Sequence, residues 1–388
     1  MEAYLDYAAT TPVSEAVKER MLCAFSADFG NPSSRHKKGF EAEKMVSQAR
    51  KKLAETLKCQ EKEIVFTSGG TESNNHALIG CATANCRRGK HIITSSIEHA
   101  SVLEPLLFLE GQGYEVTYLP VDADGRVRAE DVAEAVRDDT ILLSLMHVNN
   151  EIGSIQPLEE LTRAARKKNP NLLVHVDAIQ SYGKLPIIPK RIGIDLLSVS
   201  AHKIHGPKGV GMLYVKDKTK IRPIIFGGGQ QDGMRSGTEN VAGIVGLAEA
   251  AAKMHEQMDA YREQLYAKKE YFVDLLQKEI EGVTINGIKN VPLRETAPHI
   301  VSVSFRGIKS QVLLNALEED GIYVSSGSAC SSNHPQLSGT LKAIHVADDL
   351  LDSTLRFSFS IMTTKEELSY AVDRLKVHLP VLRKYYRH

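Results

Sequence analysis

The chain has 388 residues, which is long enough for two packed domains rather than one small core. Its composition, with 42% hydrophobic and 25% charged residues, is ordinary for a globular protein. Lys and Arg number 48, as do Asp and Glu, so no global field favours nucleic acid or a membrane surface. The composition therefore predicts neither direct nucleic-acid binding nor membrane association.

The N-terminal sequence MEAYLDYAATTP is acidic and lacks a basic start followed by an apolar core, so it does not predict a signal peptide. The longest apolar runs, such as 141–148, have the length of a strand and are too short to span a bilayer. The cysteines are odd in number and match no common zinc or disulfide spacing: Cys23, Cys59, Cys81, Cys86 and Cys330. We therefore expect reduced thiols in a cytoplasmic protein.

Short apolar segments alternate with helical patterns from about residue 63 to residue 215. The expected strands are 63–67, 91–95, 115–119, 140–147, 172–176, 196–200 and 210–215. The expected helices between them are 71–85, 100–112, 129–137 and 158–168. This alternation predicts an α/β fold in which a mainly parallel seven-stranded sheet lies between layers of helices. A tight Gly-rich turn before the last strand allows one antiparallel pairing.

A different pattern follows a long charged helical stretch over 241–280. The expected elements after it are strands 299–304, 322–325 and 354–359 and helices 310–319 and 336–344. A final helix opens at Thr364, with Glu367 at the spacing of a capping box. We expect a large domain over 15–260, and a smaller α+β domain formed by 1–14 and 261–388.

Polar residues follow the expected strands, and ligands of open α/β sheets bind at the carboxyl ends of strands. After the first strand, Gly69 and Gly70 permit a tight turn, and Thr71 opens a helix whose free N–H groups suit a phosphate. A plain helix cap with a flexible entry is the alternative. The strand ends are therefore the places to look for a site.

Two further strand ends carry groups that suit a planar ligand. His99 is placed to stack on such a ligand or to move protons, although a lone histidine is more often structural. Asn149 and Asn150 either shape a turn or hydrogen-bond a ring substituent.

The next two strand ends carry a carboxylate and a lysine. Asp177 ends an apolar strand, where an unpaired carboxylate is costly, so it needs a partner such as a protonated ring nitrogen. A metal pair with His175 is the alternative, although no third ligand is apparent. Lys203 follows the next strand with Ser200 and His202 beside it, although a lysine at a strand end is usually just solvated. Taken together, these residues suit pyridoxal 5′-phosphate, whose aldehyde needs a lysine and whose ring nitrogen needs a carboxylate.

Segments spread over nearly the whole chain resemble a known family. They are YLDYAATTP, GNPSSRH, TSGGTESNN, SIEHASV, HVNNEIG, HVDAIQSYGKLP, SVSAHKIHGPKGVG, GGGQQDGMRSGTENV, SSGSACSS and LRFSFS. In order and spacing they are similar to those of cysteine desulfurases of the NifS/IscS type, which are class V aminotransferases of PLP fold type I. The resemblance implies pyridoxal 5′-phosphate as cofactor, L-cysteine as substrate and a homodimer. It implies no metal site.

The resemblance also implies a role for individual residues. Lys203 carries the cofactor as a Schiff base, His99 stacks over its ring, and Cys330 is the nucleophile that accepts sulfur. Arg356, with help from Asn31, binds the substrate carboxylate. The implied cofactor-binding residues are Gly70, Thr71, Asn150, Asp177, Gln180, Ser200, His202, Lys203 and, reaching the neighbouring subunit's site, Thr238.

The reaction implied by the resemblance converts L-cysteine to L-alanine. Lys203 removes the α-proton, the Cys330 thiolate attacks the substrate sulfur, and a persulfide remains on Cys330. An acceptor protein, either an iron–sulfur scaffold or a tRNA-thiolation enzyme, then takes the sulfur. SSGSACSS resembles the subdivision of the family whose cysteine lies on a long mobile loop, so we expect poor order near 328–337 without a partner.

The chain departs from the family pattern at three places. His345 and Ser360 stand where relatives usually have glycine, and the Ser-Ser-Asn after Cys330 is similar to members dedicated to tRNA thiolation. Three other functions stay open: selenocysteine lyase, a plain class V aminotransferase, and a sulfur carrier or binding protein without cofactor. The retained Lys203 and Asp177 argue against the last.

Overall fold

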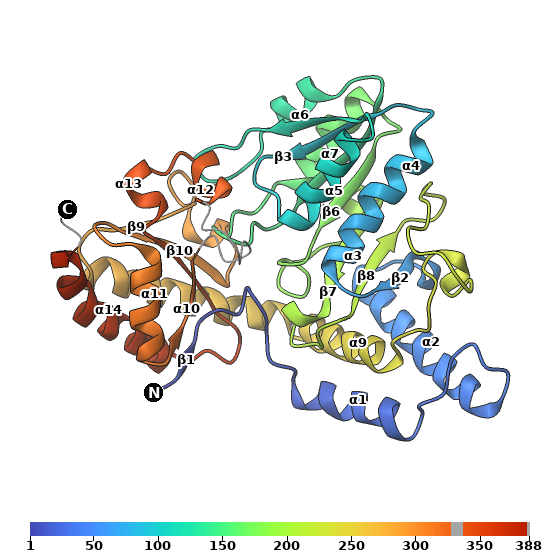
Figure 1. The fold of residues 1–388 in the computed structure, drawn as a ribbon, viewed down its shortest axis with the longest axis horizontal. Helices are drawn as coiled ribbons and strands as arrows, with labels where there is room; N and C mark the ends of the chain where they lie inside the picture. The colour runs from blue at the N-terminus through green and yellow to red at the C-terminus, as the bar shows by residue number, and fades with distance from the viewer. Residues whose placement is uncertain (327–336, 386–388) are drawn as a thin grey trace.

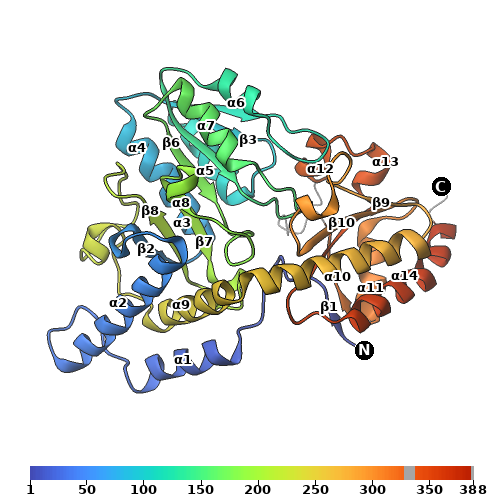
Figure 2. The same cartoon turned by 180° about the vertical axis from the view of Figure 1, so that it is seen from behind.

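The computed structural model describes residues 1–326 and 337–385. A large sheet and a small sheet lie in neighbouring parts of the molecule, each with its own helices (Figure 1). Helix α10 (Met258–Glu279) leads from the large-sheet part across the small-sheet part, as Figure 2 shows from behind.

The large sheet has seven strands in the order β2-β8-β7-β6-β5-β3-β4. They are β2 (Ile64–Thr67), β3 (His91–Ser95), β4 (Glu115–Leu119), β5 (Thr140–Met146), β6 (Leu173–Asp177), β7 (Leu196–Ser200) and β8 (Gly211–Val215). Only β8 runs against the others, pairing antiparallel with both β7 and β2. Because β8 is antiparallel to both neighbours, β2 runs in the same direction as β7, and its carboxyl end lies at the same edge as those of the parallel strands. The predicted fold class is confirmed, as is the antiparallel pairing of the last strand with β7, whereas its second antiparallel pairing, with β2, was not expected.

Helices cover both faces of this sheet. One face carries α2 (Lys37–Leu57), α6 (Ala129–Ala135), α7 (Leu158–Lys168), α8 (Pro189–Ile192) and α9 (Val241–Glu256), and the other carries α3 (Gly70–Asn75), α4 (Cys81–Asn85) and α5 (Ala100–Glu110). Ile92 and Ile93 are neighbours in β3, yet they enter different cores, because successive strand residues point to opposite faces. Helix α1 (Glu15–Ser26) packs on α9.

Three helical features differ from the expectation. The expected helix 71–85 begins at Gly70 and contains a π-helical segment, His76–Gly80, between α3 and α4. The expected stretch 241–280 is two helices, because the backbone leaves helical geometry at Gln257 (φ −118°, ψ 19°). Helices α1 and α2 precede the first strand of the large sheet and were not expected. Single 3₁₀ turns lie at Glu61–Glu63, Ala201–Lys203, Gln231–Gly233 and Leu293–Glu295.

The small sheet is antiparallel throughout, in the order β12-β13-β10-β9. Its strands are β9 (Val283–Ile285), β10 (Ile300–Phe305), β12 (Ser325–Ser326) and β13 (Thr354–Ser358). The expected strand 322–325 is split, because β11 (Ile322–Tyr323) pairs instead with β1 (Ala3–Tyr4). The N-terminal strand therefore lies with the C-terminal part of the chain.

The small sheet has a hydrophobic core of its own, to which α10 contributes Leu265 and Phe272. Its other helices are α11 (Ser310–Glu319), α12 (Gly339–Ala343), α13 (Asp348–Leu351) and α14 (Lys365–Tyr385). The capping box of α14 is confirmed: the Thr364 N–H donates to Glu367 Oε2 at 2.6 Å and the Glu367 N–H to Thr364 Oγ1 at 3.2 Å. The domain boundaries at 14/15 and 260/261 stay a prediction.

Within the part of the chain that the structure describes, no helix combines the length and the apolar character that a membrane span needs.

Candidate active site

The turns that follow β2, β6 and β7 pack closely against one another. A Cβ atom added to Gly70 would lie 2.2 Å from Ile179 Cδ1 and 3.5 Å from Ser200 Cβ. Gly69 has φ +151°, a conformation that side chains disfavour. Only glycines allow the start of α3 to approach the ends of the neighbouring strands so closely, and the exposed Thr71 follows at this start.

Asp177 is a buried carboxylate at the end of β6. Its side chain accepts hydrogen bonds from Asn74 Nδ2 at 2.8 Å and from the Ile179 N–H at 2.9 Å. Burial raises the pKa of Asp177, while these two donors and the charges of His99 and Lys203 lower it. A cation placed beside this carboxylate would favour its ionised form.

His99 is connected to Asp177 through two side chains. The His99 ring accepts the Ser101 N–H at Nδ1 (3.0 Å), which leaves the proton of the neutral ring on Nε2. Asn74 Nδ2 contacts Ser101 Oγ and Asp177 Oδ2, both at 2.8 Å. Sequence reasoning missed Asn74 and Ser101, whose roles depend on α3 and α5 lying side by side.

Lys203 lies in the 3₁₀ turn after β7, and its Nζ donates to the carbonyl oxygens of Ala8 and Ala9, both at 2.7 Å. Lys184 was also missed by sequence reasoning. It is buried, and its Nζ donates to the carbonyl oxygen of Lys203 at 2.9 Å. Burial lowers the pKa of Lys184 to about 7, and the charge of Lys203 adds to this effect.

Positive charge gathers around the turn after β7. Burial lowers the pKa of His202 to about 4, and the charges of Lys203, Lys208 and Lys184 act in the same direction. Ser200 is buried beside this group. An anion bound here would offset the repulsion.

Gln180 and Asn150 meet the surrounding protein in different ways. The Gln180 amide donates to the Ala8 carbonyl at 2.9 Å, and its Oε1 lies 3.2 Å from His299 Nε2. The Asn150 carbonyl accepts from Arg356 Nη1 at 2.8 Å. Contact of either side chain with a cofactor stays a prediction.

Arg356 lies on β13 and is nearly buried, with 7% of its surface exposed. Its Nη2 donates to Asp6 Oδ1 at 2.7 Å and to Ser325 Oγ at 3.0 Å. Its buried Nε has no acceptor among the described residues. The guanidinium therefore keeps a donor that suits a carboxylate.

Two predicted residues, Asn31 and Thr238, are exposed in loops. Asn31 is exposed between α1 and α2, and its Oδ1 accepts from the Ser33 N–H at 2.9 Å. The connection between these helices lies at the end of the molecule opposite the small sheet that carries Arg356, in both views (Figures 1 and 2). The proposed partnership of Asn31 with Arg356 is therefore not supported within one chain. Thr238 is exposed in the loop before α9.

Cys330 and most of the expected poorly ordered segment lie outside the described residues, so both expectations stay predictions.

The alternative prediction paired His175 with Asp177 as metal ligands, but in the structure both ring nitrogens of His175 contact serine hydroxyls. Its nitrogens lie 2.8 Å from Ser144 Oγ and 3.0 Å from Ser198 Oγ, inside the sheet. The histidine thus ties three strands together.

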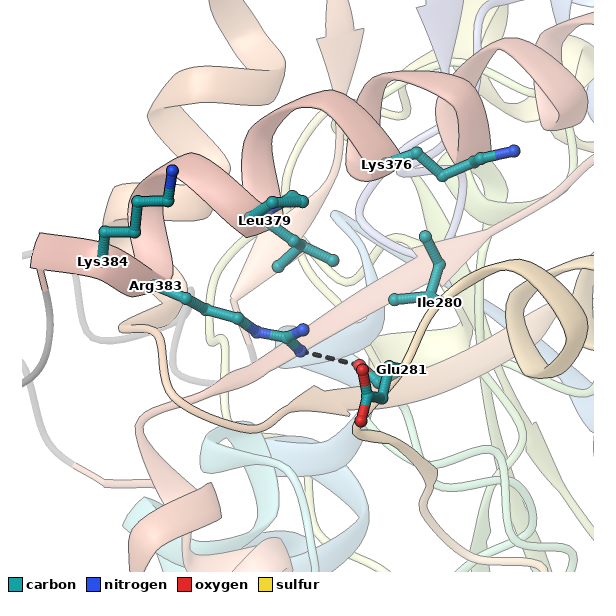
Figure 3. A pocket seen from close by; sticks show the side chains of 7 residues that line it. Ile280, Glu281, Lys376, Leu379, Arg383 and Lys384 are labelled. Carbon is teal, nitrogen blue, oxygen red and sulfur yellow. Dashed lines mark hydrogen bonds between the residues drawn. The ribbon is translucent and has the colours of Figure 1, made fainter.

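A separate cavity of about 630 Å³ lies between α14 and the chain after α10. Figure 3 shows Lys376, Arg383 and Lys384 around it, with Arg383 Nη2 donating to the Glu281 carbonyl at 2.9 Å. It contains none of the residues predicted for the site.

Comparison with known proteins identifies the family. The family model described as Aminotransferase class-V matches residues 3–371. A protein of Dictyoglomus turgidum named cysteine desulfurase IscS is 46% identical, over 98% of this chain and 95% of that protein. This chain belongs to the cysteine desulfurases of the aminotransferase class-V family.

Solved structures agree with this assignment. A NifS-like protein superposes with a TM-score of 0.92 at 39% identity, covering 98% of this chain and all of that one. A structure of SspA in complex with cysteine has a TM-score of 0.81 at 36% identity, covering 93% of this chain and 100% of that one. Relatives and fold therefore point to the same family.

Enzymes of this family generally depend on pyridoxal phosphate. The residues present fit that group in three ways. The glycines at the start of α3 leave its backbone N–H groups uncovered by side chains, which suits a phosphate. Positive charge around the turn after β7 suits the same anion. Asp177 is a buried carboxylate suited to a cationic ring nitrogen.

Proposed function

We propose that this cysteine desulfurase uses pyridoxal 5′-phosphate to convert L-cysteine to L-alanine, with Cys330 receiving the sulfur. The observation that carries the proposal is that buried Asp177 is linked to His99 through Asn74 and Ser101, while Lys203 lies in the turn after β7, the strand next to β6. When bound, pyridoxal phosphate supplies an acceptor for the electrons of the substrate's α-carbon.

The chain's own residues would hold this group in place. Lys203 would be the amine that holds it, and Asp177 would face its ring nitrogen. Its phosphate would be held by Gly70, Thr71, Ser200 and His202. Nδ1 of His99 accepts the Ser101 N–H, so the proton of the neutral ring lies on Nε2, the nitrogen that would act on the substrate side.

Arg356 would orient the substrate. A carboxylate accepts strong hydrogen bonds from a guanidinium, and the Nε of Arg356, which has no acceptor among the described residues, would supply one donor. The α-carbon would then face Lys203, whose amine would take the α-proton and would return a proton to the same carbon as L-alanine forms. The net reaction needs no outside oxidant. The C–S bond of L-cysteine breaks, its electron pair stays on Cβ, and Cβ takes up a proton to become the methyl group of L-alanine. The Cys330 thiolate meanwhile forms the S–S bond of a persulfide.

Replacing Cys330 by Ser tests the assignment. We expect Cys330→Ser to keep the L-cysteine-dependent change in cofactor absorbance and to lose persulfide and L-alanine formation. Lys203→Ala is expected to lose the absorbance band itself. Undiminished L-alanine formation by Cys330→Ser would reject the role of Cys330. Competition between L-cysteine and L-selenocysteine separates the desulfurase from a selenocysteine lyase.

We further propose a cytoplasmic homodimer in which Thr238, exposed in one chain, completes the neighbouring site. Mixing Lys203→Ala and Thr238→Ala chains tests this, because one site of each mixed dimer would carry neither substitution. Activity above that of either variant alone supports the shared site, and its absence contradicts it.

The sulfur acceptor is proposed to be an iron–sulfur scaffold or a tRNA-thiolation enzyme. Capture of partners by protein trapped with a persulfide on Cys330, followed by mass spectrometry, distinguishes the two.

A further inference from the structure

One turn of the large sheet is connected to the chain on both sides of the segment 327–336, which contains Cys330. This turn, residues 149–152, follows β5. Before the segment, Ser325 Oγ accepts from Arg356 Nη2 at 3.0 Å, and Arg356 Nη1 donates to the Asn150 carbonyl at 2.8 Å. After the segment, Ser338 Oγ donates to Glu151 Oε2 at 2.5 Å.

The contact after the segment depends on the Glu151 carboxylate. Its other oxygen, Oε1, accepts from Thr340 Oγ1 at 3.3 Å. Ser338 Oγ also accepts the Leu341 N–H at 3.0 Å and so caps α12. Hydrogen bonds to a carboxylate are stronger than those between neutral groups. Glu151 therefore holds the first turn of α12, where the described chain resumes.

Glu151 is itself fixed to the candidate active site. The buried Asn149 accepts the N–H groups of Glu151 and Ile152 at Oδ1, both at 2.9 Å, and donates to the Ile97 carbonyl at 3.0 Å. Ile97 lies two residues before His99 in the turn after β3. The carboxylate thus connects the strand ends of the large sheet to α12.

The charges around Glu151 come from the proposed substrate site. Burial raises the pKa of Glu151. It is lowered by the hydrogen bond from Ser338, by the charge of Arg356, by the hydrogen bond from Thr340 and by the charge of His99. None of the steps proposed above uses this carboxylate, so its two hydroxyl contacts need another explanation.

We propose that Glu151 is a positioning residue for sulfur transfer, fixing the chain just after Cys330 relative to the strand ends. The proposal rests on the proposed function, because it concerns the step in which the Cys330 thiolate forms the S–S bond. In that step the C–S bond of the substrate breaks and its electron pair stays on Cβ. In this role Glu151 acts through its contacts with Ser338 and Thr340.

Single-turnover kinetics of the holoenzyme with saturating L-cysteine test the proposal. Persulfide on Cys330 is measured by alkylation and mass spectrometry, and the change in cofactor absorbance is followed in the same reaction. We expect Glu151→Ala to slow persulfide formation by about 10²-fold, the scale of a roughly 1 Å misplacement, while the absorbance change persists. Glu151→Gln keeps an acceptor oxygen and is expected to lose less.

A double-mutant cycle assigns the effect to the contact itself. Thr340→Val combined with Glu151→Ala is expected to be no slower than Glu151→Ala alone, because both remove the same interaction. Glu160→Ala, an exposed glutamate of α7, is the matched control and should leave both measurements unchanged. If Glu151→Ala fails to fold, Glu151→Gln with Thr340→Val gives the same cycle.

Hydrogen exchange of the cofactor-free protein provides a readout that does not need activity. The amides of α12 are expected to exchange faster in Glu151→Ala than in the parent and in Glu160→Ala, because the cap at Ser338 loses its support. Wild-type persulfide rates in Glu151→Ala, or equal slowing of both kinetic phases, would overturn the proposal. Absence of persulfide on Cys330 in the unaltered enzyme would instead reject the proposed function itself.

Discussion

The buried ammonium of Lys184 donates a hydrogen bond to the carbonyl oxygen of Lys203, the residue proposed to bind the cofactor. Lys184 thus fixes the main chain of the turn that carries Lys203, and it adds positive charge next to that amine. Each of these effects can be separated from catalysis by measuring stability.

Lys184→Met should change how stability depends on pH. The folded-state pKa of Lys184 is about 7, below its usual 10.5, so the unfolded chain binds the proton more readily between these values. Protonation therefore penalises folding below pH 7, and the penalty fades as the pH rises to 10.5. We expect the unfolding free energy of the parent, measured relative to that of Lys184→Met, to rise by roughly 3–5 kcal/mol from pH 7 to pH 10. Urea unfolding of the cofactor-free proteins measures this. The exposed Lys190→Met should show no such gain.

Glu98→Gln should show the opposite pH dependence. Glu98 is buried, and its burial raises its pKa to about 8, from the usual 4.5. Its protonated form is therefore favoured by folding, and that stability is lost as the pH rises through 8. We expect the unfolding free energy of Glu98→Gln, measured relative to that of the parent, to rise by roughly a few kcal/mol from pH 5 to pH 9. Thermal or urea unfolding at the two pH values decides, and parallel curves for parent and variant would contradict the expectation.

Gly70→Ala should disrupt the start of α3, because its Cβ would meet Ile179 Cδ1 at 2.2 Å. We expect a loss of about 1–3 kcal/mol, the scale of overpacking, together with weaker retention of pyridoxal phosphate. The substitution Ile179→Ala in the same chain removes the clashing atoms and should recover part of both. Thermal unfolding and equilibrium dialysis measure the two effects. Failure of the second substitution to help would show that the clash is not the cause.

His345→Gly should stabilise the protein. His345 is exposed, follows α12 and has φ +59°, a conformation that glycine adopts without steric cost. We expect a gain of about 0.5–1 kcal/mol in the unfolding free energy. Lys342→Gly, exposed within α12 itself, should instead destabilise by a similar amount. A loss in both variants would mean that the His345 backbone is not the source of strain.

Much of this site was accessible from the sequence because parallel strands collect their carboxyl ends at one edge. Once the strands before the turns of the site are recognised, their polar residues are expected to converge. The close approach of Gly70 to Ile179 and Ser200 shows that the turns after β2, β6 and β7 meet. The departure at His345 was also visible, and its positive φ supplies the reason that glycine suits this position.

The remaining features depend on long-range contacts that leave no local pattern. Lys184 and Glu151 look like ordinary surface residues in the sequence, and only the packing of distant turns gives them their partners. The break at Gln257 lies in a stretch with unbroken helical character. Ser360 is different again: it follows β13, and its Oγ accepts the Met362 N–H at 3.0 Å, so the serine itself closes the turn.

The placement of β8 between β2 and β7 sets an order of assembly. Ile64 pairs with Tyr214, and Ala3 pairs with Ile322, so the first strands of the chain find their neighbours only after much of the remainder has been synthesised. Contacts of such sequence separation form late and slowly. Among the described strands, β2 meets the rest of the large sheet only through β8, so a chain truncated before β8 would lack the partner that holds the glycine turn beside Ile179 and Ser200.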